Sequence, residues 1–181
     1  KILLKNAKHT PSPFKKEKNT YHAVYVGIAE IDWLFLDIAS SLRSDIFFHI
    51  IGSYTQNIKR NNIIYHGLKH YDDTLVFIAH ADLLLHIKAL HSRNITKDAA
   101  NTCYMKDLSK TLKFMQYQYY GHPIIAPKTM EITEPNIFTY SPTKDSIFEC
   151  LHVATLSRKR PVITGLDWID IVKKLVAHQK I

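Results

Sequence analysis

Two side chains near residue 115 could hold an anionic ligand that carries hydroxyl groups. Lys113 and Gln116 are three residues apart in "KFMQYQYYG", residues 113–121, so a helix there would carry both on one face. An ammonium attracts phosphate, and an amide hydrogen-bonds a hydroxyl as donor or acceptor. A helix beginning near Ser109 would add free N–H groups and a positive dipole end, with Lys110 in its first turn. The same residues would also suit a solvated helix face, and composition does not decide between these interpretations.

The elements that must position these side chains are short apolar runs that alternate with helical patterns. The runs predict strands over 22–27, 46–52, 62–67, 81–88 and 122–127. Helical spacing predicts helices over 33–42, 71–80, 109–121, 143–158 and 166–178, with loops over 89–107 and 128–143. This alternation is typical of an α/β domain with a parallel sheet covered on both faces. We therefore expect a Rossmann-like, doubly wound sheet of about five strands.

Single residues sharpen some of these boundaries. Asp32 is a candidate N-cap for the helix over 33–42, and Gly121 occupies the position expected just past the end of the 109–121 helix. Asp72 and Asp73 open the 71–80 helix, where carboxylates favour the helix dipole, so we expect capping rather than catalysis.

The domain organisation follows from length and composition. The 181 residues suffice for one domain with a real core, and 46% hydrophobic content argues against disorder. Residues 1–20 are lysine-rich and contain two prolines, so we expect a linker or lead-in segment before a domain over 21–181. Because the chain starts with Lys1, we expect it to be an excised part of a longer protein.

The net charge of +8 is compatible with a nucleic acid, an anionic lipid or a phosphorylated ligand. There is neither an RNP-like aromatic strand motif nor a zinc-finger spacing, so we do not expect nucleic acid as a partner. Cys103 and Cys150 lie far apart and suit a reducing compartment. We see neither a transmembrane run nor a signal peptide.

Ligands of doubly wound sheets bind at the carboxyl ends of the strands, near the switch in strand order. That rule selects the loops after Gly27, Gly52, Gly67 and Lys88, where Glu30 and Asp32 also lie. We expect Asp32 to cap its helix, and a role near a ligand is the minority interpretation. Eleven histidines invite a metal hypothesis, but no acidic partners cluster with them at ligand spacing, so we expect no metal.

The stretch from Lys113 to Ala126 resembles the "K-x-x-Q/E-Y-x-x-x-G-x-P-V-V-A" signature of the nucleotide-sugar domain in GT-B glycosyltransferases. The form with glutamine at position 116 is most similar to the GumK-like glucuronosyltransferases of xanthan assembly. The likeness extends over residues 22–178 and includes the runs "HAVYVG", "FFHIIGS", "NIIYHGLKHYDDTLVFIAHADLLLHIK" and "LDWIDIVKKLV".

This resemblance implies a fold and a role. GT-B enzymes have two Rossmann-like domains, and the C-terminal one, which this chain resembles, binds the nucleotide of the donor sugar. It implies a metal-independent transferase that uses UDP or a UDP-sugar and acts in polysaccharide or glycoconjugate synthesis, with possible glucuronosyl transfer to a glycan or lipid-linked acceptor. The acid/base carboxylate would come from the N-terminal domain, so we expect the fragment alone to be inactive. The implied location is cytoplasmic, with peripheral contact at the anionic inner face of the membrane.

The resemblance also assigns site residues on the helix that carries the signature. Lys113 would contact the diphosphate and stabilise the leaving nucleoside diphosphate, while Gln116 would lie near the ribose and phosphate. Thr111 and Leu112 match positions at the helix start that face the phosphates.

The remaining assigned residues lie in the loops. Ala29, in the loop after Gly27, falls near the diphosphate, and Lys88 would meet phosphate where the family has a Pro-Tyr pair. Three consecutive residues fall where the family's loop holds the base: Gly67, Leu68 and Lys69.

Three alternatives remain beside this interpretation. A receiver domain shares the fold but needs acidic residues where the first and third strands end in Gly27 and Gly67. The chain could also be half of a GT-B-type sugar-nucleotide epimerase, or a non-enzymatic basic α/β binding module. Binding of a nucleoside diphosphate, without salt-sensitive DNA binding, would separate the transferase domain from the basic module.

Overall fold

The computed structural model describes residues 2–15, 17–28, 31–87, 112–130 and 136–157. In chain order the described elements are α1 (Ile2–His9), β1 (Tyr21–Val26), α2 (Trp33–Leu42), β2 (Ile46–Ile51), β3 (Ile63–Gly67), α3 (Tyr71–His80), β4 (Leu83–Leu85), α6 (Leu112–Tyr120), β5 (Ile124–Pro127), the 3-10 helix η2 (Lys128–Met130), β6 (Ile137–Tyr140) and α7 (Lys144–Leu156).

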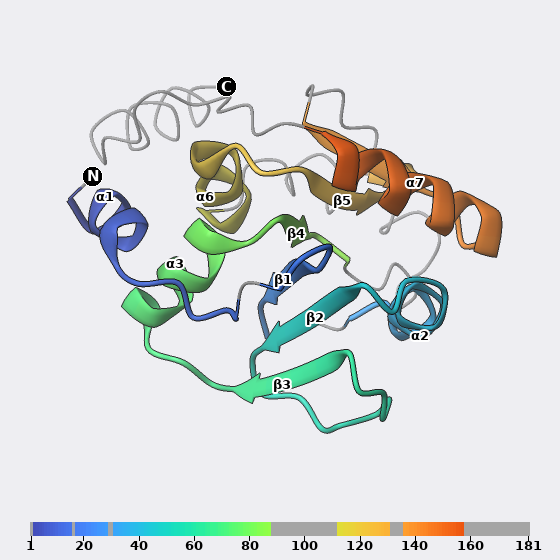
Figure 1. Cartoon of the computed structure of the whole chain (residues 1–181), viewed down its shortest axis with the longest axis horizontal. Helices are drawn as coiled ribbons and strands as arrows, with labels where there is room; N and C mark the ends of the chain where they lie inside the picture. Colours follow the sequence, from blue (N-terminus) through green and yellow to red (C-terminus); the bar gives the residue numbers. More distant parts are fainter. Residues whose placement is uncertain (1, 16, 29–30, 88–111, 131–135, 158–181) are drawn as a thin grey trace, which may run out of the picture.

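The six described strands form one sheet in the order β3-β2-β1-β4-β5-β6, and every neighbouring pair is parallel (Figure 1). Parallel strands need crossover connections, which place helices on the faces of the sheet. The predicted Rossmann-like, doubly wound fold is confirmed, with one strand more than the five expected. The strand order reverses between β1 and β4, which are neighbours in the sheet.

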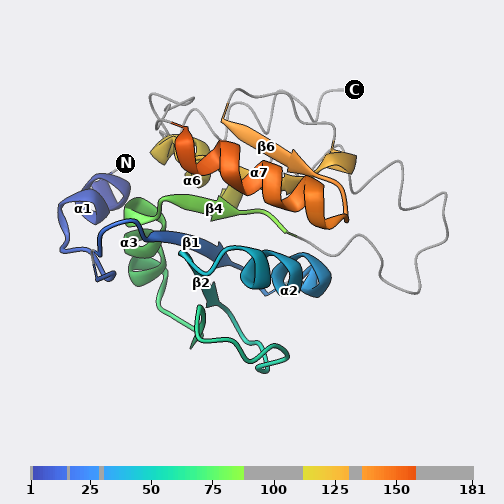
Figure 2. The same cartoon turned by 45° about the vertical axis from the view of Figure 1, so that its right-hand side comes forward.

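Two hydrophobic clusters lie on opposite faces of this sheet. Helices α2 and α7 cover one face, and α1, α3 and α6 cover the other (Figures 1 and 2). Side chains of β1 alternate between the faces: Ala23 and Tyr25 join the first cluster, and Val24 joins the second. Because both faces are buried, the strands read as continuous apolar runs, which is the pattern the sequence shows.

Capping residues set the ends of several helices. The Asp32 carboxylate accepts a 3.0 Å hydrogen bond from the Phe35 N–H at the start of α2, which confirms its predicted capping role. Thr143 accepts in the same way from the Ser146 N–H at the start of α7. Gly121 follows α6 with a φ of +71°, as expected for a residue just past a helix end.

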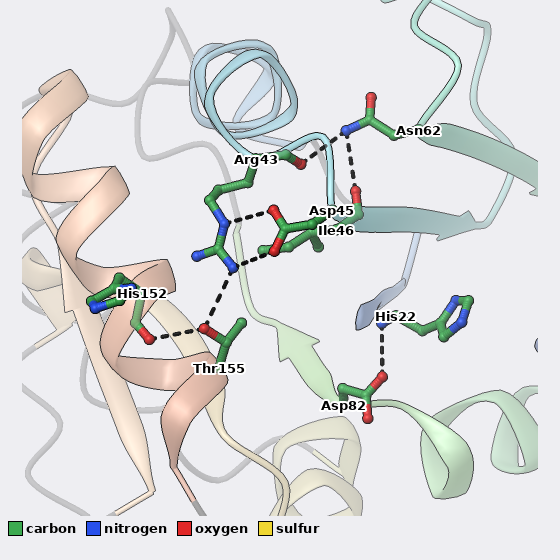
Figure 3. A network of polar contacts seen from close by, with 8 residues as sticks. All are labelled: His22, Arg43, Asp45, Ile46, Asn62, Asp82, His152 and Thr155. Carbon is green, nitrogen blue, oxygen red and sulfur yellow. Dashed lines mark hydrogen bonds and ion pairs between the residues drawn. The ribbon is translucent and has the colours of Figure 1, made fainter. Parts of the chain in front are cut away.

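A polar network connects the start of β2 with neighbouring segments at this end of the sheet (Figure 3). The Arg43 guanidinium donates to both carboxylate oxygens of Asp45, at 2.8 and 2.7 Å, and reaches the Thr155 hydroxyl of α7 at 3.5 Å. This pairing holds the pKa of Asp45 below its usual value, against the opposing effect of burial. The buried Asn62 amide nitrogen lies 3.1 Å from three carbonyl oxygens, those of Ser40, Arg43 and Ile46. These contacts lie at the amino ends of the strands and serve the scaffold.

Two segments differ from the sequence-based expectation. The lead-in expected over residues 1–20 contains helix α1, so the ordered structure starts before Tyr21. Leu4 and Ala7 of α1 are buried, and α1 contacts α3. The many lysines of this segment made these apolar packing positions hard to recognise in the sequence. The loop expected over 128–143 contains η2 and the edge strand β6.

Other elements agree more closely. The predicted helices over 33–42 and 71–80 coincide with α2 and α3, and the one over 143–158 corresponds to α7. The strand expected over 81–88 is confined to the three residues of β4. The helix predicted over 166–178 lies outside the described residues.

Candidate functional site

The candidate site lies where the strand order reverses, at the carboxyl ends of β1 and β4. Three of the predicted ligand loops start along this edge. The Gly27 N–H donates to the Ile51 carbonyl oxygen at 3.0 Å, and the Gly52 N–H donates to that of Gly67 at 3.0 Å. The ends of β1, β2 and β3 are therefore bonded side by side, and they present Gly27, Gly52 and Gly67 along one edge.

Gly52 brings two of these loops into close contact. A Cβ atom at this position would lie 2.0 Å from the Gly27 carbonyl oxygen, and its φ of +151° is one that side chains rarely adopt. Gly67 also has a positive φ, +68°, but a Cβ there would meet nothing within 4 Å. Glycine is thus required at Gly52 for both space and backbone conformation, and at Gly67 for backbone conformation alone.

Lys113 reaches this edge from the first turn of α6. Because α6 leads into β5, which is parallel to the other strands, its amino-terminal end lies over the carboxyl ends of the strands. The Lys113 ammonium lies 4.9 Å from the centroid of the Tyr25 ring, within the range of a cation–π interaction. A cation is therefore placed at the carboxyl end of β1, next to the reversal in strand order.

Gln116 lies one turn further along α6 and is only 6% exposed. Its amide nitrogen donates a 2.7 Å hydrogen bond to the Tyr71 hydroxyl at the start of α3. Tyr71 follows the β3–α3 loop, in which Leu68 is 71% exposed and Lys69 is also exposed. The structure thus connects Gln116 to the loop predicted to hold the base, through the side chain of Tyr71.

The other face of α6 packs on the sheet, as the pattern of its aromatic residues predicts. Phe114, Tyr117 and Tyr120 are almost completely buried. The Tyr117 hydroxyl lies 3.5 Å from the Leu85 carbonyl oxygen of β4, which fixes the helix above the strand-order reversal. Burial raises the pKa of Tyr117, so this phenol stays protonated at neutral pH.

The structure describes most of the sequence-predicted site residues, and some of them lie outside the described part of the chain. Gly27, Lys113 and Gln116 lie on this edge or the helix above it, together with the loop that contains Gly67, Leu68 and Lys69. Leu112 begins α6. Three residues lie outside the described ones: Ala29, Lys88 and Thr111.

Sequence reasoning missed two tyrosines that contact the predicted residues. Tyr25 lies beneath Lys113, and Tyr71 accepts from Gln116. Tyr25 is within an apolar strand and Tyr71 is next to capping aspartates, so both could be taken for ordinary structural residues. The only available signal was their position at the carboxyl end of β1 and at the start of a helix on the ligand side.

Three histidines form a hydrogen-bonded row across β1, β2 and β3. His22 Nδ1 lies 3.0 Å from His49 Nε2, and His49 Nδ1 lies 2.9 Å from His66 Nε2. His22 Nε2 faces the Lys15 carbonyl oxygen at 3.1 Å and must donate to it. In neutral rings this fixes the direction of the row, since His49 then donates to His22 and His66 donates to His49.

This row has a structural role on the sheet face that α1, α3 and α6 cover, where its rings pack against Phe14 and Phe77. Burial, and then the charges of His66 and His22, lower the pKa of His49 to about 3. Burial, followed by Lys69, also lowers the pKa of His66. Each ring nitrogen that faces another ring is used in a hydrogen bond, and among the described residues no group of three or more His, Cys, Asp or Glu could hold a metal ion.

Carboxylates at the ligand edge have structural roles. Besides capping α2, Asp32 accepts a 2.8 Å hydrogen bond from the buried Tyr140 hydroxyl of β6. Burial and the Asp32 charge raise the pKa of Tyr140, so it remains a donor. Asp72 and Asp73 lie in the first turn of α3, where they favour the helix dipole.

None of the helices in the described part of the chain has the length and apolar content that a membrane crossing requires.

Comparison with solved structures agrees with the observed fold. No protein-family model matches the chain. The chain is 26% identical over 174 residues to the UDP-glucuronate:glycolipid 2-beta-glucuronosyltransferase of Xanthomonas campestris pv. campestris, a match that covers 92% of this chain and 39% of that protein.

Among solved structures, the chain is similar to WaaG, a glycosyltransferase involved in lipopolysaccharide biosynthesis. The TM-score is 0.53 at 14% sequence identity, over 91% of this chain and 44% of WaaG. The chain thus spans about two fifths of the length of these two proteins. It has the Rossmann-like fold of one half of a GT-B glycosyltransferase, and the two likenesses together support a GT-B glycosyltransferase domain.

Proposed function

We propose that this chain is the donor-nucleotide-binding domain of a glycosyltransferase, and that it binds UDP or a UDP-sugar. The carrying observation is the Lys113 ammonium, which lies over the Tyr25 ring at the reversal in strand order. Doubly wound sheets bind nucleotides in this crevice. An ammonium placed there would attract the diphosphate and stabilise the negative charge that develops on the leaving nucleoside diphosphate.

The other predicted residues have roles that follow from their positions. Gly27 directly follows β1 and would allow close approach of the diphosphate, with Ala29, Lys88, Thr111 and Leu112 proposed around it from the family resemblance. The exposed loop formed by Gly67, Leu68 and Lys69 would hold the base. Gln116 would act near the ribose, through its amide or through the Tyr71 hydroxyl that it contacts.

The wider activity is part of the same proposal. The relative's name describes transfer from UDP-glucuronate to a glycolipid, and we propose a hexosyl or glucuronosyl transfer of this kind for the whole enzyme. The acceptor would be a glycan or a lipid-linked sugar, and the acid/base carboxylate would come from a second domain. We expect the reaction to need no metal and the fragment alone to be inactive.

We further propose a cytoplasmic location with peripheral contact at the inner face of the membrane. The net charge is +8, and exposed lysines extend over the first eighteen residues at Lys5, Lys8, Lys15 and Lys18. Each basic residue near an anionic surface contributes about 1 kcal/mol. Reversal of these four lysines to glutamate should abolish sedimentation with anionic vesicles, and unchanged sedimentation would contradict this part of the proposal.

The central experiment is calorimetric titration with UDP, GDP and ADP. We expect UDP to bind and Lys113→Ala to weaken binding by about ten- to a hundredfold, because a charge-assisted contact contributes about 1.5–3 kcal/mol. Lys5→Ala is the matched control: it removes the same charge from α1, next to Leu4, whose carbonyl oxygen accepts from Tyr120 at the opposite end of α6. If no nucleotide binds, or if the two variants bind equally well, the site assignment is wrong.

A further inference from the structure

The Lys113 ammonium lies over the face of the Tyr25 ring. Tyr25 belongs to β1 and is 1% exposed, whereas Lys113 belongs to α6 and is partly exposed. The two meet across the carboxyl edge of the sheet with 4.9 Å between Nζ and the ring centroid. We infer that Tyr25 is a positioning residue that holds Lys113 for the donor diphosphate, an inference that rests on the proposed function.

The ring is itself held from the side opposite α6. The Tyr54 hydroxyl donates to the Tyr25 hydroxyl at 3.3 Å, and the two rings meet edge to face at 5.9 Å between centroids. Trp33 packs on Tyr54 in the same manner, also at 5.9 Å. Three aromatic rings from β1, the β2–β3 loop and α2 therefore fix the orientation of the face that Lys113 contacts.

A neutral ring suits this task better than a carboxylate would. A lysine side chain has a flexible four-carbon stem and loses rotamer freedom when its head is fixed. The ring's negative face attracts the ammonium without adding a formal counter-charge that would compete with phosphate. Burial raises the pKa of the Tyr25 phenol, so the ring carries no charge at neutral pH.

The position of the ring also connects it to the backbone at the end of β1. A Cβ atom at Gly27 would lie 2.9 Å from the Tyr25 hydroxyl oxygen, so this oxygen lies directly beside the glycine. Ring, glycine and ammonium thus converge at the carboxyl end of β1. This is the place where a diphosphate in a doubly wound domain is expected.

The test compares Tyr25→Met, which removes the ring but fills much of its volume, with Tyr25→Phe, which keeps the ring. In NMR spectra of the wild type, we expect ring-current shifts to move the Lys113 ε-protons upfield. The shift should persist in Tyr25→Phe and disappear in Tyr25→Met. Normal ε-proton positions in the wild type would overturn the inference, and this measurement does not require the methionine variant to fold.

Calorimetry with UDP supplies the functional measurement. Tyr25→Met should weaken UDP binding about five- to thirtyfold, the equivalent of a partly desolvated cation–π contact, while Tyr25→Phe stays within about twofold of the wild type. In a Lys113→Ala background, Tyr25→Met should cause no further loss, because the ring acts through the lysine. A purely structural role would weaken binding in both backgrounds and would overturn the inference.

The outcomes separate this inference from the proposed function. If the wild type does not bind UDP, both the proposed function and the inference about Tyr25 are wrong. If the wild type binds and Lys113→Ala weakens binding, while Tyr25→Met binds like the wild type, only the positioning role of Tyr25 falls.

Discussion

The buried Gln116 amide donates a 2.7 Å hydrogen bond to the Tyr71 hydroxyl and thereby joins the middle of α6 to the start of α3. Tyr71 begins α3, after the loop that we propose for the base. The bond therefore connects this loop region to α6, the helix that carries Lys113. A net contribution of about 1 kcal/mol is typical of such a bond, and a buried amide left without a partner costs about 1–3 kcal/mol.

A double-mutant cycle measures this bond. Tyr71→Phe and Gln116→Met should each lower the free energy of unfolding, and the double variant should be less destabilised than the sum of the two by about 1 kcal/mol. Urea unfolding followed by circular dichroism gives all four values. Additive effects would show that the hydrogen bond contributes nothing in solution.

The two glycines with positive φ at the ligand edge should respond differently to substitution. Gly52→Ala places a methyl group 2.0 Å from the Gly27 carbonyl oxygen, so we expect it to destabilise the fold by more than about 3 kcal/mol. Gly67→Ala introduces backbone strain but no clash and should cost about 1–2 kcal/mol. Urea unfolding of both variants checks the order, and equal losses would mean that the close contact between the β1 and β2 loops is relieved without cost.

Much of the scaffold was predictable because local signals and tertiary packing agree. The bounds of α2 and α3 follow from apolar residues at helical spacing, and Asp32 marks the start of α2. Gly121 marked the end of α6 in the same way. Strand β6 was missed because its four residues become a strand only by pairing with β5, and α1 was missed because lysines dominate its composition.

The candidate site was predictable in part, for a different physical reason. The rule for doubly wound sheets selected the carboxyl edge, and the helical spacing of Lys113 and Gln116 selected one face of α6. Their partners, Tyr25 and Tyr71, are 88 and 45 positions away in the chain, so local pattern does not indicate them. Such contacts arise only when the sheet brings β1, α3 and α6 together.

The histidine row predicts that stability depends on pH. The pKa of His49 is about 3 in the folded chain and about 6.5 when unfolded. Between these values the unfolded chain binds the extra proton, so the stability present above pH 6.5 is lost as the pH falls. The loss is about 1.4 kcal/mol per pH unit for this one group between pH 6 and pH 4, and the lowered pKa of His66 acts in the same direction.

The measurement is the free energy of unfolding in urea at pH 4, 5, 6 and 7. His49→Gln removes the titrating group and should flatten the dependence on pH by about 1.4 kcal/mol per unit. His152→Gln, which changes an exposed histidine on α7 outside the row, is the matched control. An unchanged slope in His49→Gln would show that the row does not hold His49 neutral.

Asp32 has two separable structural tasks. Its carboxylate caps α2 through the Phe35 N–H and accepts from the buried Tyr140 hydroxyl at 2.8 Å. Asp32→Ser keeps a capping oxygen but is too short to reach Tyr140, so it should cost about 1.5–3 kcal/mol, like Tyr140→Phe. Asp32→Ala also removes the cap and should cost about 1 kcal/mol more.

Urea unfolding orders these three variants, and UDP titration separates the two interpretations of Asp32. If Asp32 only caps α2 and holds β6, the serine variant should bind UDP as the wild type does, because neither contact involves the ligand. Weaker binding by a serine variant that is otherwise folded would instead place the carboxylate near the donor. An alanine variant no less stable than the serine variant would show that the cap, although formed, contributes nothing to α2.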